Sequence, residues 1–235
     1  MESHISDTWK PPEYTNCRKV ELDAGILEAN RGIAIMQDAQ ETERYKILRT
    51  RIHQHARNRK LSTIMITSPD NGEGKTVTAI NMSLIFARDL KQTVLLVDCD
   101  LKGQDIHRYM GIDSSVSLID YFLDGVPLNE LIIWPGIEKL TLISGNRSVD
   151  ESSELLSSDI MENLVQEMGD RYGDRYVFFD APPVLKRSEA IAMAHMMDGI
   201  IMVVQAGRTI KKDVMEAVSL LPEEKFLGFV FNRYK

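Results

Sequence analysis

Cysteine is scarce in this sequence. The 235 residues include only two cysteines, Cys17 and Cys99. Cys99 lies between two acids at the end of an apolar segment, and Cys17 lies in a polar leader, so no disulfide between them is expected. A chain without disulfides is typical of the reducing cytoplasm, and a cytoplasmic location is therefore the expectation.

Long hydrophobic runs are missing as well. The longest apolar stretch, near residues 199–204, is far too short to cross a bilayer. The chain starts with MESHISDTWK, which lacks the basic start and the apolar core of a signal peptide. The five histidines show no metal-ligand spacing, so a zinc site is not expected. These absences argue against a membrane-spanning, a secreted or a zinc-binding protein.

The composition is that of one soluble α/β domain preceded by a leader. Hydrophobic residues make up 43% and charged residues 27% of the chain, which is ordinary for a globular protein. Residues 1–37 have mixed polarity and no sustained period, and we expect them to be flexible or extended. Residues 38–235 are expected to form the folded domain.

The net charge of −7 is unevenly distributed. Residues 41–60 hold seven Lys or Arg against two Glu, whereas residues 150–174 hold eight acids against Arg171 alone. This asymmetry predicts a surface that meets another charged surface. A solvated helix face without a partner is the alternative, because charge runs often face only water.

Apolar strand-like segments alternate with helical patterns along most of the chain. This order is typical of βαβ units and predicts a doubly wound, mostly parallel sheet covered on both faces. The strands are expected at residues 61–67, 93–98, 139–143, 175–180, 199–204 and 226–231. The helices are expected at residues 39–56, 75–90, 117–124, 154–169, 188–196 and 210–220.

The decapeptide TSPDNGEGKT at residues 67–76 is the most informative segment. It follows a strand and opens a helix, which is the arrangement that binds phosphate groups through backbone N–H groups and the helix dipole. Lys75 is expected to bind the β- and γ-phosphates of a nucleotide, and the Thr76 hydroxyl to bind Mg²⁺. Because Pro69 stands where the usual pattern has its first glycine, an ordinary turn before a helix is the alternative. The predicted nucleotide-binding residues are Asp70, Asn71, Gly72, Glu73, Gly74, Lys75, Thr76 and Val77.

Two further strands end in carboxylates. Asp98 and Asp100 follow the segment Val94–Val97, and Asp180 follows the segment Tyr176–Phe179. Ligands of an open parallel sheet bind beyond the carboxyl ends of its strands, so these acids and Lys75 are expected to form a Mg²⁺–nucleotide site. The predicted metal ligands are Thr76, Asp98 and Asp180. Single Asp residues at strand ends are also frequent turn formers and helix caps, which is the alternative for each of them.

Together these motifs resemble those of the bacterial tyrosine kinases, the autokinases of exopolysaccharide and capsule loci. The resemblance runs from about Glu43 to Asn232 and rests on the Gly-Glu-Gly-Lys core and on the two acidic motifs. It implies a P-loop NTPase fold of the partitioning-ATPase-like class. Partitioning ATPases themselves usually carry a lysine early in the phosphate loop, where this chain has Ser68 and Pro69.

The resemblance implies a protein-tyrosine autokinase that uses ATP and Mg²⁺ and regulates exopolysaccharide synthesis or export. Lys75, Asp98, Asp100 and Asp180 would be the catalytic residues, with Asp98 as the acceptor of the tyrosine proton and Asp100 in support. Asn232 would contact the adenine, although a strand-end turn residue is an equal alternative. The alternatives in function are a regulatory ATPase of partitioning type and a nucleotide switch with little kinase activity.

The resemblance also implies partners. A homo-oligomer would form through Glu43, Lys46 and Arg49, where Lys46 replaces an arginine of the family motif and so loses the planar fork that grips carboxylates. Other partners would be a membrane-anchored polysaccharide co-polymerase or activator, which would hold the chain at the inner membrane, and a cognate phosphatase; no nucleic acid is expected. The family usually ends in a tyrosine cluster, whereas here Tyr234 alone stands as the phospho-acceptor near the C-terminus.

Overall fold

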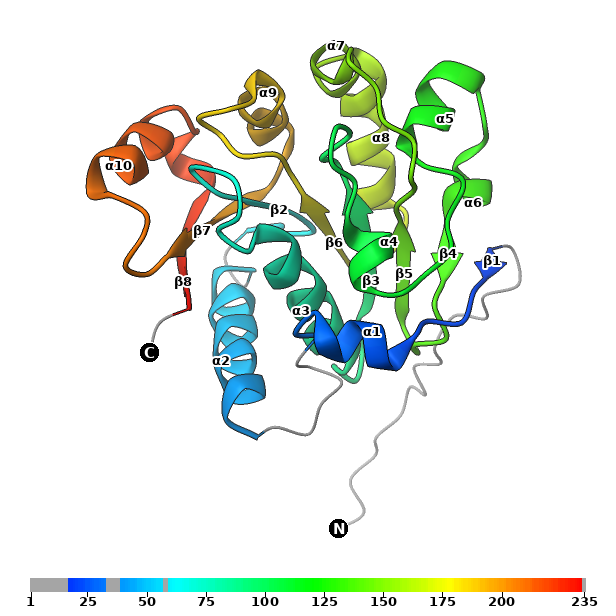
Figure 1. Ribbon diagram of the computed structural model, residues 1–235, viewed down its shortest axis with the longest axis horizontal. Helices are drawn as coiled ribbons and strands as arrows, with labels where there is room; N and C mark the ends of the chain where they lie inside the picture. Colours follow the sequence, from blue (N-terminus) through cyan, green and yellow to red (C-terminus); the bar gives the residue numbers. More distant parts are fainter. Residues whose placement is uncertain (1–16, 33–38, 57–58, 234–235) are drawn as a thin grey trace.

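The computed structural model describes residues 17–32, 39–56 and 59–233. These residues form one eight-stranded sheet with helices on both faces (Figure 1). The strand order is β1-β4-β5-β3-β6-β2-β7-β8, and every neighbouring pair is parallel except β4 and β5. The strands are β1 (Arg18–Lys19), β2 (Thr63–Thr67), β3 (Thr93–Asp98), β4 (Ile133–Trp134), β5 (Leu140–Ile143), β6 (Arg175–Asp180), β7 (Gly199–Gln205) and β8 (Phe226–Asn232).

Ten α-helices and one 3-10 turn connect these strands within the described residues. The helices that precede β5 are α1 (Ala24–Ala29), α2 (Ala39–Ala56), α3 (Lys75–Ala87), α4 (Ile106–Tyr109), α5 (Leu118–Asp124) and α6 (Leu128–Leu131). Those that follow β5 are α7 (Ser152–Leu156), α8 (Asp159–Asp170), α9 (Ser188–Met196) and α10 (Lys211–Ser219), with the 3-10 turn at Glu223–Lys225.

The sheet separates two hydrophobic layers. One layer packs α1, α2, α3 and α4 against residues such as Ile64, Ile66 and Phe178. The other packs α5 to α10 against residues such as Met65 and Phe179. Figure 1 shows α1, α2 and α3 on one side of the sheet and α5, α8 and α9 on the other. The central strands have no solvated face, which explains their nearly continuous apolar sequences.

The predicted strands and most predicted helices are confirmed, with one difference in the acidic region. A single helix was expected over residues 154–169, but the structure has α7 and α8 with Ser157 and Ser158 between them. The Ser158 hydroxyl accepts a hydrogen bond from the Met161 N–H at 3.3 Å and thereby caps α8. A serine in this position starts a new helix more readily than it continues an old one.

Residues 17–32 differ from the flexible or extended leader that the sequence predicts. They contribute β1, which pairs with β4, and α1, whose Leu27 is 1% exposed. The Asp23 carboxylate caps α1 by accepting from the Ile26 N–H at 3.0 Å. The Arg31 carbonyl accepts a hydrogen bond from Asn81 Nδ2 of α3 at 2.9 Å. These contacts hold the segment on the same layer as α2 and α3.

Within the described ranges, no helix combines the length and the apolar character that are needed to cross a bilayer.

Candidate active site

Three neighbouring strands end at one edge of the sheet. The order β3-β6-β2 places Asp98 opposite Asp180 in register, and Asp180 in turn opposite Ile66. The phosphate loop therefore leaves β2 directly beside both carboxylates. The predicted meeting of these strand ends is what the structure shows.

The loop at residues 68–74 takes a backbone path that requires glycine at two positions. Gly72 has φ +76° and Gly74 has φ +94°, a region that residues with a side chain rarely adopt. A Cβ atom on Gly74 would lie 2.0 Å from Asn232 Nδ2. Gly74 also caps α3, so the N–H groups of the first turn of α3 are left for a ligand.

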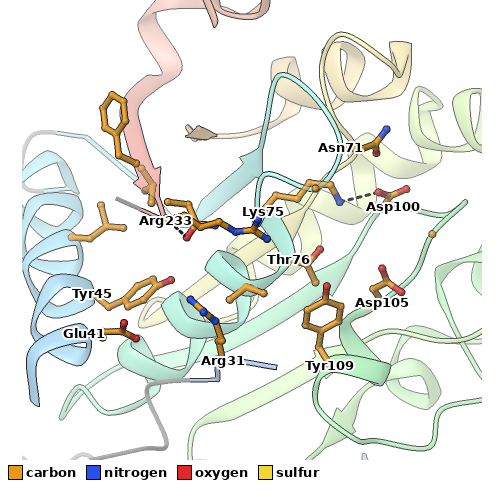
Figure 2. A pocket seen from close by; sticks show the side chains of 18 of the residues that line it. Arg31, Glu41, Tyr45, Asn71, Lys75, Thr76, Asp100, Asp105, Tyr109 and Arg233 are labelled. Carbon is orange, nitrogen blue, oxygen red and sulfur yellow. Dashed lines mark hydrogen bonds and ion pairs between the residues drawn. The ribbon is translucent and has the colours of Figure 1, made fainter. Parts of the chain in front are cut away.

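Lys75 projects from the first turn of α3 into a ring of carboxylates. Its Nζ lies 2.8 Å from Asp100 Oδ2 and 3.8 Å from Asp180 Oδ1. Figure 2 shows the Lys75–Asp100 contact across the pocket. Burial alone would lower the pKa of Lys75, but the charges of Asp180 and Asp100 outweigh it and raise that pKa well above its usual value. The lysine is therefore a permanent cation that is already paired before any phosphate binds.

Asp98 and Asp180 are both buried and only partly satisfied. Asp98 Oδ2 accepts from Ser144 Oγ at 2.9 Å and from the N–H groups of Asp105 and Ile106 at 3.1 Å each. Asp98 Oδ1 and Asp180 Oδ1 have no hydrogen-bond partner. Burial and the charge of Asp180 raise the pKa of Asp98 well above its usual range, and burial raises the pKa of Asp180 to about 6. Two buried carboxylates with oxygens that lack a hydrogen-bond partner, and with the Lys75 ammonium 3.8 Å from Asp180 Oδ1, have room for a further cation.

The residues fit Mg²⁺ as that cation. Mg²⁺ prefers oxygen ligands and usually binds through one or two carboxylates, its own waters and substrate phosphates. The oxygens of Asp98, Asp180 and Thr76 are such ligands, and Thr76 is near enough to Asp180 to lower the pKa of that carboxyl. In the described part of the chain, no group of three or more His, Cys, Asp or Glu could hold a metal alone. The remaining ligands of a bound Mg²⁺ would be water and substrate phosphate oxygens.

Buried hydrogen bonds hold the phosphate loop on the side that faces the protein interior. The Glu73 side chain accepts hydrogen bonds from the Thr209 hydroxyl and from the Asp70 N–H, while Asn232 Nδ2 donates to the Glu73 carbonyl at 2.8 Å. The Asn232 carbonyl accepts from the Ala206 N–H at 3.0 Å. We refer to Glu73, Thr209 and Asn232 as the loop clamp.

The loop clamp changes the interpretation of two predicted residues. Glu73 was expected only as part of the nucleotide-binding loop, and its side chain is 2% exposed and turned into the protein. Asn232 lines the pocket, its amide Nδ2 donates to the loop backbone and its Oδ1 accepts from the Arg233 N–H at 2.9 Å, while its expected contact with adenine stays a prediction. The contact between Thr209 and Glu73 was not predicted, because no local pattern links two residues that lie 136 positions apart.

The nucleotide-sized pocket is lined by segments from both ends of the chain. It has a volume of about 860 Å³ and includes Asn71, Gly72, Lys75, Thr76, Val77 and Asp100. Arg31, Tyr45 of α2 and Tyr109 of α4 line the side away from Asn71, and Arg233 enters from the end of β8 (Figure 2). These four residues carry no local motif and were not predicted. Asp70 is not among the residues that line this pocket, and its carboxylate lies 3.5 Å from Lys186 Nζ.

The three residues predicted for oligomerisation lie on α2 but differ in exposure. Lys46 and Glu43 are exposed and pair with each other at 3.2 Å. Arg49 is half-buried and donates from Nη1 to the Ile85 carbonyl of α3 at 2.9 Å. Only the first two are therefore free to meet another surface. The predicted acceptor Tyr234 lies outside the described residues.

Known proteins resemble this chain in sequence and in structure. A family model described as an AAA domain matches residues 61–221. The tyrosine-protein kinase YwqD of Bacillus subtilis (strain 168) is 31% identical over 196 residues, which make up 83% of this chain and 81% of YwqD.

Solved structures share the fold. The kinase domain of the Escherichia coli tyrosine kinase ETK aligns with a TM-score of 0.77 at 22% identity, and the alignment covers 96% of this chain and 92% of that domain. The septum site-determining protein MinD of Pyrococcus horikoshii OT3, complexed with Mg-ADP, aligns with a TM-score of 0.61 at 21% identity over 74% of this chain and 71% of MinD. The alignment with the ETK kinase domain thus covers a larger share of this chain than the alignment with MinD does.

Proposed function

The chain belongs to the bacterial tyrosine-protein kinases of the AAA-domain family, and from that premise we propose that it transfers the γ-phosphate of ATP to tyrosine and thereby regulates exopolysaccharide synthesis or export. One observation supports the site most directly. Lys75, Thr76 and the two unsatisfied carboxylates of Asp98 and Asp180 meet at the mouth of a phosphate-binding loop. This is the set of groups that phosphoryl transfer requires for positioning and charge neutralisation.

Each residue has a distinct task in this proposal. The N–H groups of residues 70–77 bind the phosphates. The Lys75 ammonium leaves the Asp100 carboxylate and binds the β- and γ-phosphate oxygens instead. Bound Mg²⁺ would neutralise phosphate charge, held by Thr76, Asp98 and Asp180. Asp100 stays within reach of Lys75 and supports the site.

Asp98 is the proposed base. The acceptor phenol oxygen forms a bond to the γ-phosphorus, the bond from that phosphorus to the β–γ bridging oxygen breaks, and the phenol proton passes to Asp98. Asp98 Oδ2 is held by hydrogen bonds, whereas Asp98 Oδ1 has no hydrogen-bond partner, so the carboxylate keeps an oxygen that can accept a proton. ADP and a phosphotyrosine are the products.

Partners and location follow from the family resemblance. We propose that the chain forms a homo-oligomer and acts with a membrane-anchored polysaccharide co-polymerase or activator at the inner membrane, where a cognate phosphatase reverses its action. The exposed charges of α2, including Lys46 and Glu43, support an electrostatic contact between subunits. A partitioning-type ATPase is not favoured, because relatives such as YwqD are tyrosine-protein kinases.

Lys75→Met tests the catalytic assignment. The variant should lose transfer of labelled phosphate from ATP to a random Glu–Tyr copolymer, because nothing replaces the cation at the β- and γ-phosphates. Removing Lys75 from between buried carboxylates also lets them take up protons, so the fold should persist by circular dichroism. Lys91→Met, an exposed lysine before β3, is the matched control and should retain full activity. Transfer that survives in Lys75→Met would refute the assignment.

A further inference from the structure

Tyr172 is placed differently from every other tyrosine in the described residues. Its side chain is 45% exposed, and it lies in the loop at residues 171–174 between α8 and β6. Tyr45, Tyr109 and Tyr121 are half-buried on helices, and Tyr176 is 7% exposed within β6. A tyrosine can enter a kinase pocket only if its backbone is free of a helix or a strand. Tyr172 alone meets that condition in the described part of the chain.

Cations surround Tyr172. The guanidinium of Arg175 lies 4.2 Å from the centre of its ring. Arg59, Lys60 and Arg175 line the same hollow as Tyr172, together with Asp170 and Asp174, and the hollow has a volume of about 270 Å³. Lys60 is paired there with the Asp170 carboxylate. These groups could receive a phosphate, because arginine and lysine bind phosphate oxygens through charge-assisted hydrogen bonds.

We propose that Tyr172 is a phosphorylation site of this kinase and that a second copy of the chain phosphorylates it. This inference rests on the proposed kinase function and names its substrate. The Tyr172 phenol oxygen bonds to the γ-phosphorus of ATP held by the other copy, the bond to the β–γ bridging oxygen breaks, and the proton goes to that copy's Asp98. The products are ADP and one phosphotyrosine.

The fold requires the reaction to be intermolecular. Tyr172 precedes the amino end of β6, whereas Asp180 stands at its carboxyl end. A strand of six residues separates its two ends by about 16 Å at about 3.3 Å per residue. Tyr172 and the phosphate loop therefore lie at opposite edges of the sheet, and no movement of the short 171–174 loop brings them together.

A phosphate on Tyr172 would rearrange its surroundings. Its charge of about −2 competes with Asp170 for Lys60 and attracts Arg175. The hollow also touches Ala56, the last residue of α2. Phosphorylation would therefore act on the end of the helix that carries the predicted oligomerisation residues.

The test uses full-length chains in two isotopic forms. Unlabelled active protein is mixed with ¹⁵N-labelled Lys75→Met protein and MgATP, and phosphopeptides of the heavy chain are mapped by mass spectrometry. Phosphate on Tyr172 of the heavy chain is the expected result, since that chain cannot phosphorylate itself. Tyr172→Phe in the heavy chain should remove most of its phosphate, whereas Tyr121→Phe on α5 should not.

The same mixture includes the Glu–Tyr copolymer as a second acceptor. Phosphorylated copolymer with no phosphate on heavy-chain Tyr172 would overturn this inference and leave the kinase function intact. Tyr172 phosphorylated on the light chain alone would overturn the intermolecular step. The absence of phosphate from both copolymer and chain would instead overturn the proposed function itself.

Discussion

Glu73 is an acid inside a loop that must bind anions. Its carboxylate is kept from the phosphates because Thr209 and the Asp70 N–H bind it on the inner side of the loop. Burial raises the pKa of this carboxyl, and both hydrogen bonds oppose that rise by favouring the charged form. A loop with two left-handed glycines is intrinsically mobile, so a buried anchor that fixes its path can set the affinity for nucleotide.

We predict that Glu73→Ala weakens the binding of MgADP about tenfold, or by about 1.4 kcal/mol. The variant leaves the Thr209 hydroxyl and the Asp70 N–H without their acceptor, so the loop samples conformations that cannot bind phosphate. Titration calorimetry with MgADP measures the effect. Glu73→Gln retains one acceptor oxygen and should lose less affinity than Glu73→Ala.

Glu130→Ala provides the control, because Glu130 is an exposed residue of the short helix α6. Its affinity for MgADP should equal that of the unmodified protein. Equal affinity of Glu73→Ala and the unmodified protein would show that the loop holds its conformation without the clamp.

Individual helices and strands could be predicted from the sequence wherever they were long enough to show a hydrophobic pattern. The helix expected at residues 39–56 is α2, and its residues Tyr45, Leu48, Ile52 and Ala56, which recur at helical spacing, pack against the α3 side of the sheet. The two-residue strands β1 and β4 and the six-residue α1 escaped prediction, because so few residues cannot show a period. Their positions depend on tertiary contacts such as that between the Arg31 carbonyl and Asn81.

The start of β2 depends on a residue of the segment that precedes β7. Asp198 Oδ2 accepts from the Ser62 N–H at 2.8 Å and from the Thr63 N–H at 3.0 Å. Partial burial would raise the pKa of Asp198, but these hydrogen bonds outweigh it and hold the pKa below its usual value. A lowered folded pKa stabilises the fold above the unfolded pKa of about 3.9, and that stability is lost as the pH falls through the folded pKa.

Asp198→Asn should therefore lower the free energy of unfolding at pH 7 by about 1–2 kcal/mol, near the low end for hydrogen bonds to a charged acceptor because Asp198 is only half-buried. Urea unfolding at a series of pH values measures it. The difference from the unmodified protein should shrink as the pH is lowered below about 4, where the native carboxylate also takes up its proton. Asp150→Asn, at an exposed loop position, should change little at any pH. A difference that stays constant down to acid pH would contradict the assignment of the effect to the charge.

At the scale of the molecule, the sequence predicted which strand ends meet but not what closes the pocket over them. Asp98, Asp180 and Lys75 each stand at the end of a strongly apolar strand or in a motif, so the rule for parallel sheets brings them together. Arg31, Tyr45 and Arg233 reach the same pocket from segments that only the complete fold places side by side. Their side chains follow no shared motif, and no local pattern could have paired them.

The uneven distribution of charge between α2 and α8 bears on how copies of the molecule could contact one another. The basic helix α2 and the acidic helix α8 pack on opposite faces of the sheet (Figure 1). Their charges cannot satisfy each other within one chain. A contact from α2 of one copy to α8 of the next would be head-to-tail, and such contacts generate closed rings or open filaments rather than simple twofold dimers.

We predict that the protein self-associates beyond a dimer at low ionic strength and dissociates as salt is added, because salt screens exposed charges over about 10 Å at 0.1 M. Sedimentation velocity measures the species present. Lys46→Glu with Arg51→Glu on α2 should prevent association, and so should Glu162→Lys with Glu167→Lys on α8. An equimolar mixture of the two double variants should associate again, since the acidic α2 of one then meets the basic α8 of the other. Association that depends on α2 alone would indicate a twofold contact between identical helices, and a monomer at every salt and protein concentration would exclude the head-to-tail assembly.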